Sequence, residues 1–260
     1  MSQAEKRIFK ILGALVSVAF WVVVWAIVAK QIDSEFLLPS PKATTSVLFT
    51  LVADISFWQT VGASLIRILI AILLSLLIGS AVAAFTANIK PMDTLLSPLM
   101  TVIKATPVAS FIILAILWIE RDTLPAFITM LIVIPIVWSN VSAGITGVDK
   151  KLLEVAKIYN FSFGKKIYRI YLPSVMPYFL AACRASLGMA WKAGIAAEVL
   201  CTPKEAIGTE IYLSKMYMET TDLFAWTLTV IILSVVIEKL LISGIRSLSN
   251  KLHLSDMEVK

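Results

Sequence analysis

Long apolar runs separated by short polar segments are the dominant pattern along this 260-residue chain. A helix that crosses a lipid bilayer needs about 20 predominantly apolar residues, because each residue advances the helix by about 1.5 Å. Runs of this length occur over residues 8–29, 60–88, 95–118, 124–146, 175–200 and 223–245. The pattern therefore predicts an all-α polytopic membrane protein with six transmembrane helices, in a single transmembrane domain over residues 1–260.

Two prolines fall inside the predicted transmembrane helices, Pro107 in 95–118 and Pro135 in 124–146. Proline has no backbone N–H and its ring crowds the preceding turn, so we expect a kink in each helix. Only the polar patch Glu120-Arg121-Asp122 separates these two helices, and this short connection predicts a tight helical hairpin.

Lysine and arginine are distributed unevenly between the two sides that the six helices define. With the N-terminus inside, the cytoplasmic segments hold thirteen of these residues and the outer segments hold five. Cytoplasmic loops of membrane proteins carry such an excess, so the N- and C-termini are both predicted to be cytoplasmic. The net charge of +6 then reflects topology, and we expect no nucleic-acid partner.

Two predicted outer segments are longer than simple turns. Residues 30–59 contain helical apolar spacing from Lys42 to Phe57, and residues 201–222 contain a second such stretch from Glu205 to Met218. We expect each stretch to form a short amphipathic helix, either along the outer membrane interface or at the mouth of a pathway.

The composition supports a membrane protein, since 59% of the residues are hydrophobic and only 15% are charged. Soluble domains are about half apolar and about a quarter charged. Cys183 and Cys201 would lie about 27 Å apart on one helix, which is too far for a disulfide, so we interpret both as small apolar residues. The single histidine, His253, has no metal-ligand companions.

Small residues recur at every fourth position in two of the predicted helices. They are Ser75, Gly79, Ala83 and Ala87 in the second helix, and Ala182, Ser186, Ala190 and Gly194 in the fifth. Such a stripe lets another helix backbone approach closely. It serves either static packing or a face that slides during transport.

Five charged residues lie inside predicted transmembrane helices, namely Arg67, Lys104, Arg184, Lys192 and Glu198. A charge within the bilayer is costly unless it is paired or hydrated, so each of these side chains needs a partner or water. One interpretation is a structural ion pair or a side chain that reaches the interface. The other is a polar lining for a substrate pathway.

The loop at residues 148–173 has the pattern of a helix–turn–helix. A first short helix is predicted by apolar residues at helical spacing, Leu152, Leu153, Ala156 and Ile158. Asn160 can end this helix because asparagine tolerates the left-handed conformation. A second helix is predicted from Ser162 to Tyr171, and Pro173 closes the unit. A basic, amphipathic unit of this shape is suited to docking, although a solvated connection is the alternative.

The order Glu154-x-Ala156, Asn160 and Ile170-x-Leu172-Pro173 resembles the EAA loop of ABC-transporter permeases of the binding-protein-dependent importer type. Val155 replaces the usual middle alanine, and Asn160 replaces the usual glycine. The resemblance implies that the loop couples the permease to an ATPase. The residues it assigns to this role are Glu154, Ala156, Asn160, Gly164, Ile170, Leu172 and Pro173.

The resemblance extends from about Phe36 to Glu238 and is similar to the nitrate/sulfonate/taurine-type branch of these permeases. The motifs that carry it include Leu38-Pro39-Ser40-Pro41, Ser64-x-x-Arg67, Asn140-x-x-x-Gly144 and Ala197-Glu198. The branch commonly has a second proline four places after the one matching Pro107, where this chain has Phe111.

The resemblance implies a type I ABC importer permease in the bacterial cytoplasmic (inner) membrane. Its expected partners are a second permease subunit, in a homodimer, a cytoplasmic ABC ATPase dimer and an extracellular or periplasmic solute-binding protein. The expected substrate is a nitrate/sulfonate/taurine-like anion or a vitamin precursor. ATP and Mg are expected in the partner ATPase, because Phe163-Gly164-Lys165-Lys166 lacks the first glycine and the hydroxyl residue of a phosphate-binding loop. This chain is therefore expected to be a transport subunit and not an enzyme.

Two other functions stay open on the residues alone. An ion-coupled secondary transporter could use Arg184, Lys192 and Glu198, although such transporters often have paired broken helices in two related halves, and we find no such symmetry. A membrane enzyme is the weaker alternative, because the sequence has no Ser/His/Asp or Cys/His set and no metal-ligand cluster.

Overall fold

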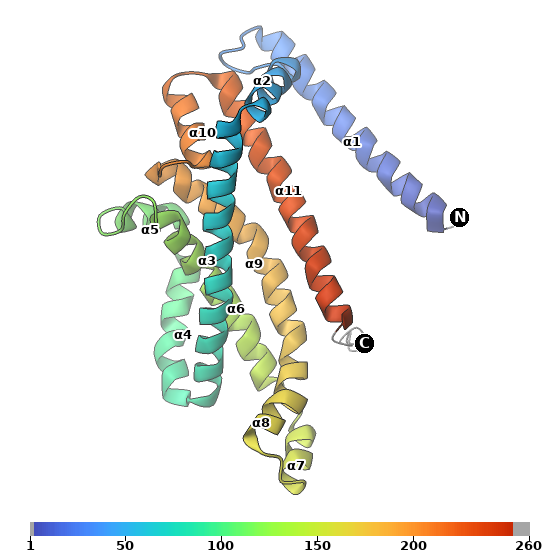
Figure 1. Ribbon diagram of the computed structural model, residues 1–260, viewed down its shortest axis with the longest axis vertical. Coiled ribbons are helices and arrows are strands. Elements are labelled where there is room, and N and C mark those ends of the chain that lie inside the picture. The colour runs from blue at the N-terminus through green and yellow to red at the C-terminus, as the bar shows by residue number, and fades with distance from the viewer. Residues whose placement is uncertain (1–2, 252–260) are drawn as a thin grey trace. The chain divides into compact units, whose positions relative to one another are not determined.

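The computed structural model describes residues 3–251, and every regular element in this range is helical. Figure 1 shows the helices, with their labels. They are α1 (Gln3–Ile32), α2 (Pro41–Ala53), α3 (Ile55–Asn88), α4 (Lys90–Ala105), α5 (Val108–Ala115), α6 (Leu124–Thr146), α7 (Lys150–Ile158), α8 (Phe163–Lys166), the π-helical turn η1 (Ile167–Tyr171), α9 (Leu172–Cys201), α10 (Ile207–Met216) and α11 (Thr220–Lys251). The all-helical class predicted from the sequence is confirmed for this part of the chain.

Four segments are long and apolar enough to cross a membrane, and they are Leu15–Ile32, Ile55–Asn88, Leu124–Thr146 and Thr220–Leu240. The bent pair α4 and α5 makes five if it counts as one span. The fifth predicted span coincides with α9, which is not in this set and is the helix that carries Arg184, Lys192 and Glu198. The number of six transmembrane helices stays a prediction.

The third predicted transmembrane helix, 95–118, is wrong as a single helix. Its first part belongs to α4, which already begins at Lys90, and α5 follows at an angle of 102° to α4. The residue before a proline is driven toward the extended conformation, and Thr106 has a ψ of 134° directly before Pro107. Pro107 therefore breaks the segment rather than kinking it. Pro135, in contrast, lies inside the continuous helix α6.

The turn between α5 and α6 is longer than the predicted hairpin connection. α5 ends at Ala115 and α6 begins at Leu124, so the polar patch Glu120-Arg121-Asp122 is only part of the connection between them. The backbone N–H groups of Thr123 and Leu124 both donate to the carbonyl of Glu120, which leads the chain into α6.

Both predicted outer helices are present, with shifted bounds. The helix expected from Lys42 to Phe57 is α2, which ends at Ala53, and Phe57 already lies in α3. The helix expected from Glu205 to Met218 is α10, which is shorter at both ends. Glu205 and Met218 have positive φ angles of 46° and 62°, a conformation that an α-helix cannot contain.

The helices divide into two compact units, Met1–Thr60 with Glu210–Ile231, and Val61–Thr209 with Ile232–Lys260. In the first unit, the Trp25 indole N–H donates to the Pro39 carbonyl over 3.0 Å, and its ring stacks on Phe224 with centroids 5.9 Å apart. The Phe57 and Trp226 rings also stack, at 5.1 Å. These aromatic contacts join α1 and α3 to the first turns of α11.

In the second unit, α6 and α9 pack together, and the predicted small-residue stripes lie at close helix contacts. A Cβ atom at Gly79 would be 2.8 Å from the Cβ of Val137 on α6. A Cβ at Gly194 would be 2.7 Å from the Ile68 side chain on α3. The packing interpretation of both stripes is therefore supported. Cys183 and Cys201 are both free and buried, as their interpretation as small apolar residues required.

Candidate functional site

The loop at residues 148–173 begins with a capped helix. The Asp149 carboxylate accepts a hydrogen bond from the backbone N–H of Lys151 over 2.9 Å, as an N-cap residue does. The helix that follows, α7, is the first of the two helices predicted in this loop, and it ends at Ile158. Figure 1 shows α7 and α8 at one end of the second unit, beyond α6 and α9.

A left-handed residue ends α7 at the position where the sequence predicts it. Asn160 has a φ of 48°, and its N–H donates to the Lys157 carbonyl over 3.2 Å. The N–H of Phe161 reaches back to the Ala156 carbonyl over 2.9 Å. These two bonds form a Schellman motif, which usually places glycine at the left-handed position. Asparagine tolerates the same conformation, so the replacement of the usual glycine keeps the turn.

A small core lies beneath the turn. Ala156 and Ile170, two residues that the sequence assigns to the coupling site, are buried together with Val148, and Phe161 packs against them. A side chain larger than Ala156 would have no room there, since this residue has no exposed surface. Ala156 and Ile170 thus hold the two halves of the loop together and do not present a surface to a partner.

The other sequence-predicted residues of the loop lie on its surface. Glu154 and Gly164 are exposed, Leu172 is about half exposed, and Pro173 is partly buried. A Cβ atom at Gly164 would meet nothing within 4 Å, so the fold of this chain does not require glycine there.

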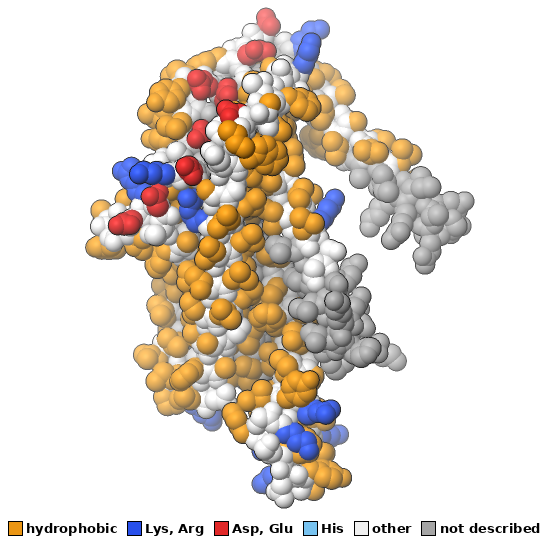
Figure 2. Space-filling model, in the orientation of Figure 1, with side chains coloured by type: hydrophobic (Ala, Val, Ile, Leu, Met, Phe, Trp, Pro, Cys, Tyr) orange, Lys and Arg blue, Asp and Glu red, His pale blue; other side chains and the backbone are white. Residues whose placement is uncertain are grey.

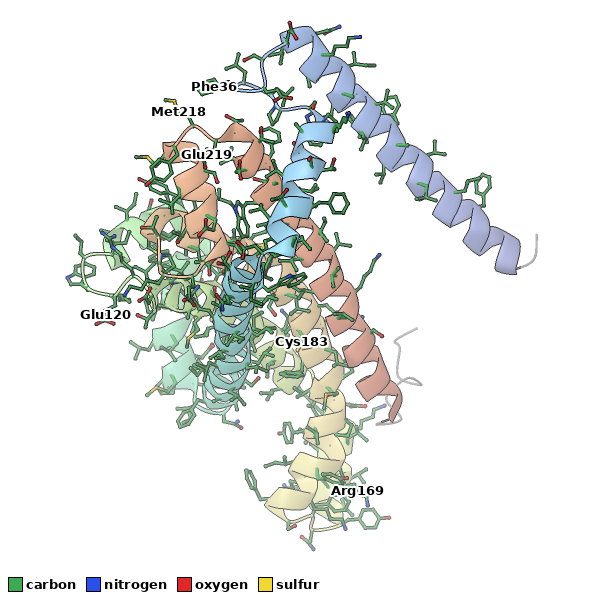
Figure 3. All side chains as sticks on the ribbon, turned by 45° about the horizontal axis from the view of Figure 1, so that its top comes forward. Phe36, Glu120, Arg169, Cys183, Met218 and Glu219 are labelled. Carbon is green, nitrogen blue, oxygen red and sulfur yellow. The ribbon has the colours of Figure 1, made fainter. Side chains whose placement is uncertain are left out.

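Large apolar side chains on this loop face outward. The exposed fraction is 75% for Ile158, 72% for Tyr159 and 80% for Phe163. Lysines and an arginine surround them, and Figure 2 shows hydrophobic and basic side chains side by side at this end of the unit, where Figure 3 labels Arg169. Exposed aromatic residues beside basic ones are typical of a surface that binds a protein partner. Sequence reasoning identified the loop and used Ile158 to predict its first helix, but it did not single out Tyr159 and Phe163.

The second half of the loop differs from its prediction. A helix does start after Ser162, but it passes through the π-helical turn η1 directly into α9, and Pro173 lies in the first turn of α9. Pro173 therefore does not close the unit. The Leu172 N–H donates to the Ile167 carbonyl, five residues back, which is the hydrogen bond of a π-helical turn. Pro173 follows in the first turn of α9, where the backbone N–H that proline lacks is not needed for a hydrogen bond.

Two of the five charged residues predicted to lie inside the membrane form a buried ion pair in the second unit. The Arg67 guanidinium on α3 lies 2.6 Å from the Glu198 carboxylate on α9, with 15% and 0% of their side chains exposed. The second carboxylate oxygen accepts from the Ser64 hydroxyl over 2.9 Å and from the Gly208 N–H over 3.2 Å. These contacts are those of a structural ion pair, which is the first of the two interpretations of Arg67 and Glu198.

The ion pair also fixes the start of α10. The Ser64 hydroxyl accepts from the Ile207 N–H over 2.9 Å, and Arg67 donates to the Lys204 carbonyl over 3.2 Å. These contacts tie α3, α9 and the first residues of α10 into one polar cluster, Ser64–Arg67–Glu198–Gly208. Sequence reasoning missed Gly208, because a glycine required for close approach has no signal in a single sequence.

We expect the substitution Gly208→Ala to destabilise this cluster. The added Cβ would lie 2.4 Å from the Glu198 Cβ and 2.4 Å from the Val199 backbone nitrogen, so backbone would have to move. Overpacking of this kind costs about 1–3 kcal/mol. The melting temperature of the purified protein measures the effect, and Gly62→Ala, where the added Cβ meets nothing within 4 Å, is the matched control. Equal melting temperatures for the two variants would contradict the tight contact.

The remaining charged residues of the predicted set do not join the cluster. The Lys104 ammonium lies 5.7 Å from the centre of the Trp138 ring, and Arg184 and Lys192 are exposed on α9. None of the three forms an ion pair within the described part of the chain. Among the residues described, no three histidine, cysteine or acidic side chains gather as a metal site would require.

Comparison with known proteins gives a family and a fold. A family model described as "Binding-protein-dependent transport system inner membrane component" matches residues 75–251. SsuC of Bacillus subtilis (strain 168), named for aliphatic sulfonates transport, is 27% identical over 91% of this chain and 83% of its own length. TauC of Escherichia coli (strain K12), a taurine transport system permease protein, is 24% identical over 88% of this chain and 83% of its own.

Solved structures agree on the fold. A chain from the crystal structure of a bacterial ABC transporter involved in the import of the acidic polysaccharide alginate has a TM-score of 0.62, at 14% identity, over 95% of this chain and 96% of its own. At this identity the likeness concerns the fold alone.

Proposed function

Because the chain belongs to the family of binding-protein-dependent transport system inner membrane components, we propose that it is the permease subunit of an ATP-driven ABC importer for a small anion. It is a multi-pass protein of the bacterial inner membrane and a transport subunit rather than an enzyme. Membership of the family implies an ATPase and a solute-binding protein as partners.

The observation that carries the proposal is the exposed apolar and basic surface of the 148–173 loop. The Schellman turn at Asn160 holds this surface in place. After the turn, α8 continues through η1 into α9 without a break in the helix. A partner that moves the loop would therefore move α9 with it, as a rigid body. In the proposal, an ATPase dimer binds ATP and Mg and closes against this loop on the cytoplasmic side.

Further parts of the proposal concern assembly and topology. Two copies of the chain form the pathway, each with six transmembrane helices and with both termini in the cytoplasm. The positive charge in the predicted cytoplasmic segments supports this orientation. The names of the relatives support a small anion, since they cover aliphatic sulfonates, taurine and nitrate. An ion-coupled secondary transporter is not favoured by any of these relatives.

The turn at Asn160 provides the test of coupling. We expect Asn160→Val to abolish most ATP-driven uptake, because a β-branched residue at a φ of 48° is strained by about 1–2 kcal/mol and would open the turn. Asn160→Gly is the matched control and should keep normal uptake. Uptake is measured in proteoliposomes that contain this chain, its ATPase and its solute-binding protein. Uptake that an ion gradient drives without the ATPase would favour the secondary transporter instead.

A further inference from the structure

Two loops of the first unit lie next to each other at the ends of two candidate membrane spans. The loop after α1 follows the span Leu15–Ile32, and the loop after α10 precedes the span Thr220–Leu240. The Thr220 hydroxyl donates to the Phe36 carbonyl over 2.7 Å, and this bond joins the two loops. Figure 3 labels Phe36 and Met218 in this region. The two loops therefore form one surface just outside both spans.

Large apolar side chains project from this surface. The exposed fraction is 56% for Phe36 and 67% for Leu37 on the first loop, and 58% for Met216 and 66% for Met218 at the end of α10. We call these four residues the outer patch. Methionine and aromatic residues are enriched at protein–protein interfaces, and a contiguous exposed apolar surface marks an interaction site.

Met218 occupies a backbone position that usually belongs to glycine. Its φ is 62°, and its N–H donates to the Lys215 carbonyl over 3.2 Å, while the Glu219 N–H donates to the Ser214 carbonyl over 2.8 Å. These two bonds form a Schellman motif, whose left-handed residue is commonly glycine. A long side chain strains the backbone there, and the Met218 side chain gains little burial in return. Its presence is explained by contact with a partner and not by the fold of this chain.

Acidic side chains surround the outer patch. Residues 30–37 and 215–222 contain four acidic residues against two basic ones, a net charge of −2. The acidic residues are Asp33, Glu35, Glu219 and Asp222, and the basic ones are Lys30 and Lys215. None of the four carboxylates forms an ion pair with another residue between positions 3 and 251. Figure 2 shows acidic side chains gathered at this end of the first unit.

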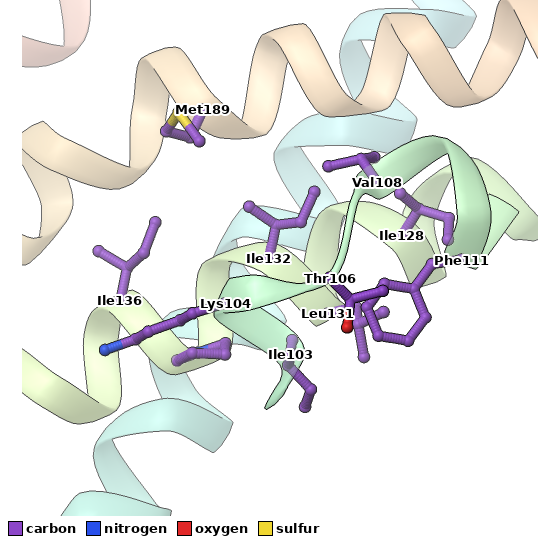
Figure 4. Close-up of a pocket in the computed structure, with 11 residues that line it drawn as sticks. Ile103, Lys104, Thr106, Val108, Phe111, Ile128, Leu131, Ile132, Ile136 and Met189 are labelled. Carbon is purple, nitrogen blue, oxygen red and sulfur yellow. The ribbon is translucent and has the colours of Figure 1, made fainter. Parts of the chain in front are cut away.

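The outer patch is not part of a described cavity. Its four residues line neither the pocket of about 140 Å³ at the break between α4 and α5, which Figure 4 shows, nor the pocket beside Lys30. Small molecules bind in concave pockets, whereas projecting apolar side chains with a charged rim suit contact with a macromolecule. A lipid surface is disfavoured, because the phosphate groups of lipid headgroups repel carboxylates. A protein with basic residues around an apolar area is the complementary partner.

We propose that the outer patch is the docking surface for the solute-binding protein, which meets it with an apolar area ringed by lysine or arginine. This inference rests on the proposed function, in which a solute-binding protein is a partner and the segments 30–59 and 201–222 lie outside the membrane. The 148–173 loop, which the proposed function assigns to the ATPase, belongs to the second unit. The two partners therefore use different surfaces of the chain.

The double variant Phe36→Ser and Met218→Gly tests the apolar contact. We expect it to weaken binding of the solute-binding protein at least tenfold, because two large side chains leave the interface. Glycine suits the left-handed position and Phe36 is more than half exposed, so the melting temperature should stay unchanged. The dissociation constant is measured by titration of the solute-binding protein onto the complete chain, assembled with its ATPase in nanodiscs. Phe49→Ser, which removes a 76% exposed ring of α2 outside the outer patch, should not change it.

Charge reversal tests the acidic rim. Glu35→Lys combined with Glu219→Lys should lower the association rate constant about tenfold at low salt, because like charges then face each other. The difference should shrink as the ionic strength rises, since salt screens exposed charges. A purely structural role of the two carboxylates would not produce this dependence on salt. An association rate constant equal to that of the unsubstituted chain at low salt overturns the assignment of a basic partner.

Other occupants of the outer patch would give different results. Unchanged binding by the double variant, together with a changed molecular mass of the assembly, would assign the patch to contact between copies of this chain. Unchanged binding with an unchanged mass would assign it to lipid, and either result overturns the proposal. If the unsubstituted chain binds no solute-binding protein, the proposed function is wrong as well. If every variant binds as tightly as the unsubstituted chain, only the location of the docking surface is wrong.

Discussion

Substitution of Arg67 by alanine is expected to unfold a large fraction of the protein. Glu198 has no exposed side-chain surface, and the Arg67 guanidinium at 2.6 Å is its only cationic partner in the described chain. Removing one member of a buried ion pair leaves an uncompensated charge and costs about 3–5 kcal/mol. This cost is a large part of the free energy of unfolding of a typical protein, which is about 5–15 kcal/mol. The free energy of unfolding in detergent micelles measures the loss.

A second substitution distinguishes charge from packing. Arg67→Met combined with Glu198→Gln removes both charges and keeps two long side chains, so it should recover most of the stability that Arg67→Ala loses. Lys192→Ala is the control for a charged residue of α9 that is exposed, and it should cost less than about 1 kcal/mol. If Arg67→Ala were as stable as Lys192→Ala, the ion pair would have no structural role.

Local patterns predicted the first helix of the 148–173 loop and the turn that ends it. The helical spacing of Leu153 and Ala156 predicted α7, and the conformational tolerance of asparagine predicted the left-handed turn at Asn160. Both depend on residues within a few positions of one another, where propensity and hydrogen bonding decide the conformation.

Contacts between residues far apart in the sequence could not be predicted from the sequence alone. The sequence indicated that Glu198 needs a partner but could not select Arg67, which is 131 positions away, because the choice depends on how α3 and α9 pack. Gly208 was missed for the same reason, since the close Glu198 backbone appears only after folding. The sequence also did not determine how Pro107 and Pro173 affect their helices. Pro107 breaks its helix and Pro173 enters one, and the difference lies in the hydrogen bonds that the neighbouring turns can rearrange.

The structure separates buried residues that build the 148–173 loop from exposed residues to which the proposed function assigns contact with a partner. Ala156 and Ile170 are buried, so their place in the family motif is explained by packing within the loop. Tyr159 and Phe163 lie on the opposite, exposed side and do not belong to the motif. Contact with the ATPase is therefore expected to depend most on residues that the motif leaves out.

We expect Tyr159→Ser combined with Phe163→Ser to weaken binding of the ATPase at least tenfold. Large aromatic side chains at the centre of an interface each contribute about 2 kcal/mol or more, and a factor of ten corresponds to about 1.4 kcal/mol. The loop itself should stay folded, because the two side chains are 72% and 80% exposed and lie outside its buried core. Titration of the ATPase onto the permease in nanodiscs gives the dissociation constant.

The matched control for this double variant is Tyr217→Ser, which removes an aromatic side chain that is 71% exposed but lies outside the 148–173 loop. It should leave the dissociation constant unchanged. Uptake by the double variant should fall in parallel with binding and should recover when the ATPase is supplied in excess, because only association is impaired. Uptake that stays low at saturating ATPase would instead mean that these aromatic residues transmit the movement of the ATPase to α9. Unchanged binding would show that the ATPase docks elsewhere, and the proposed role of the loop surface would then be wrong.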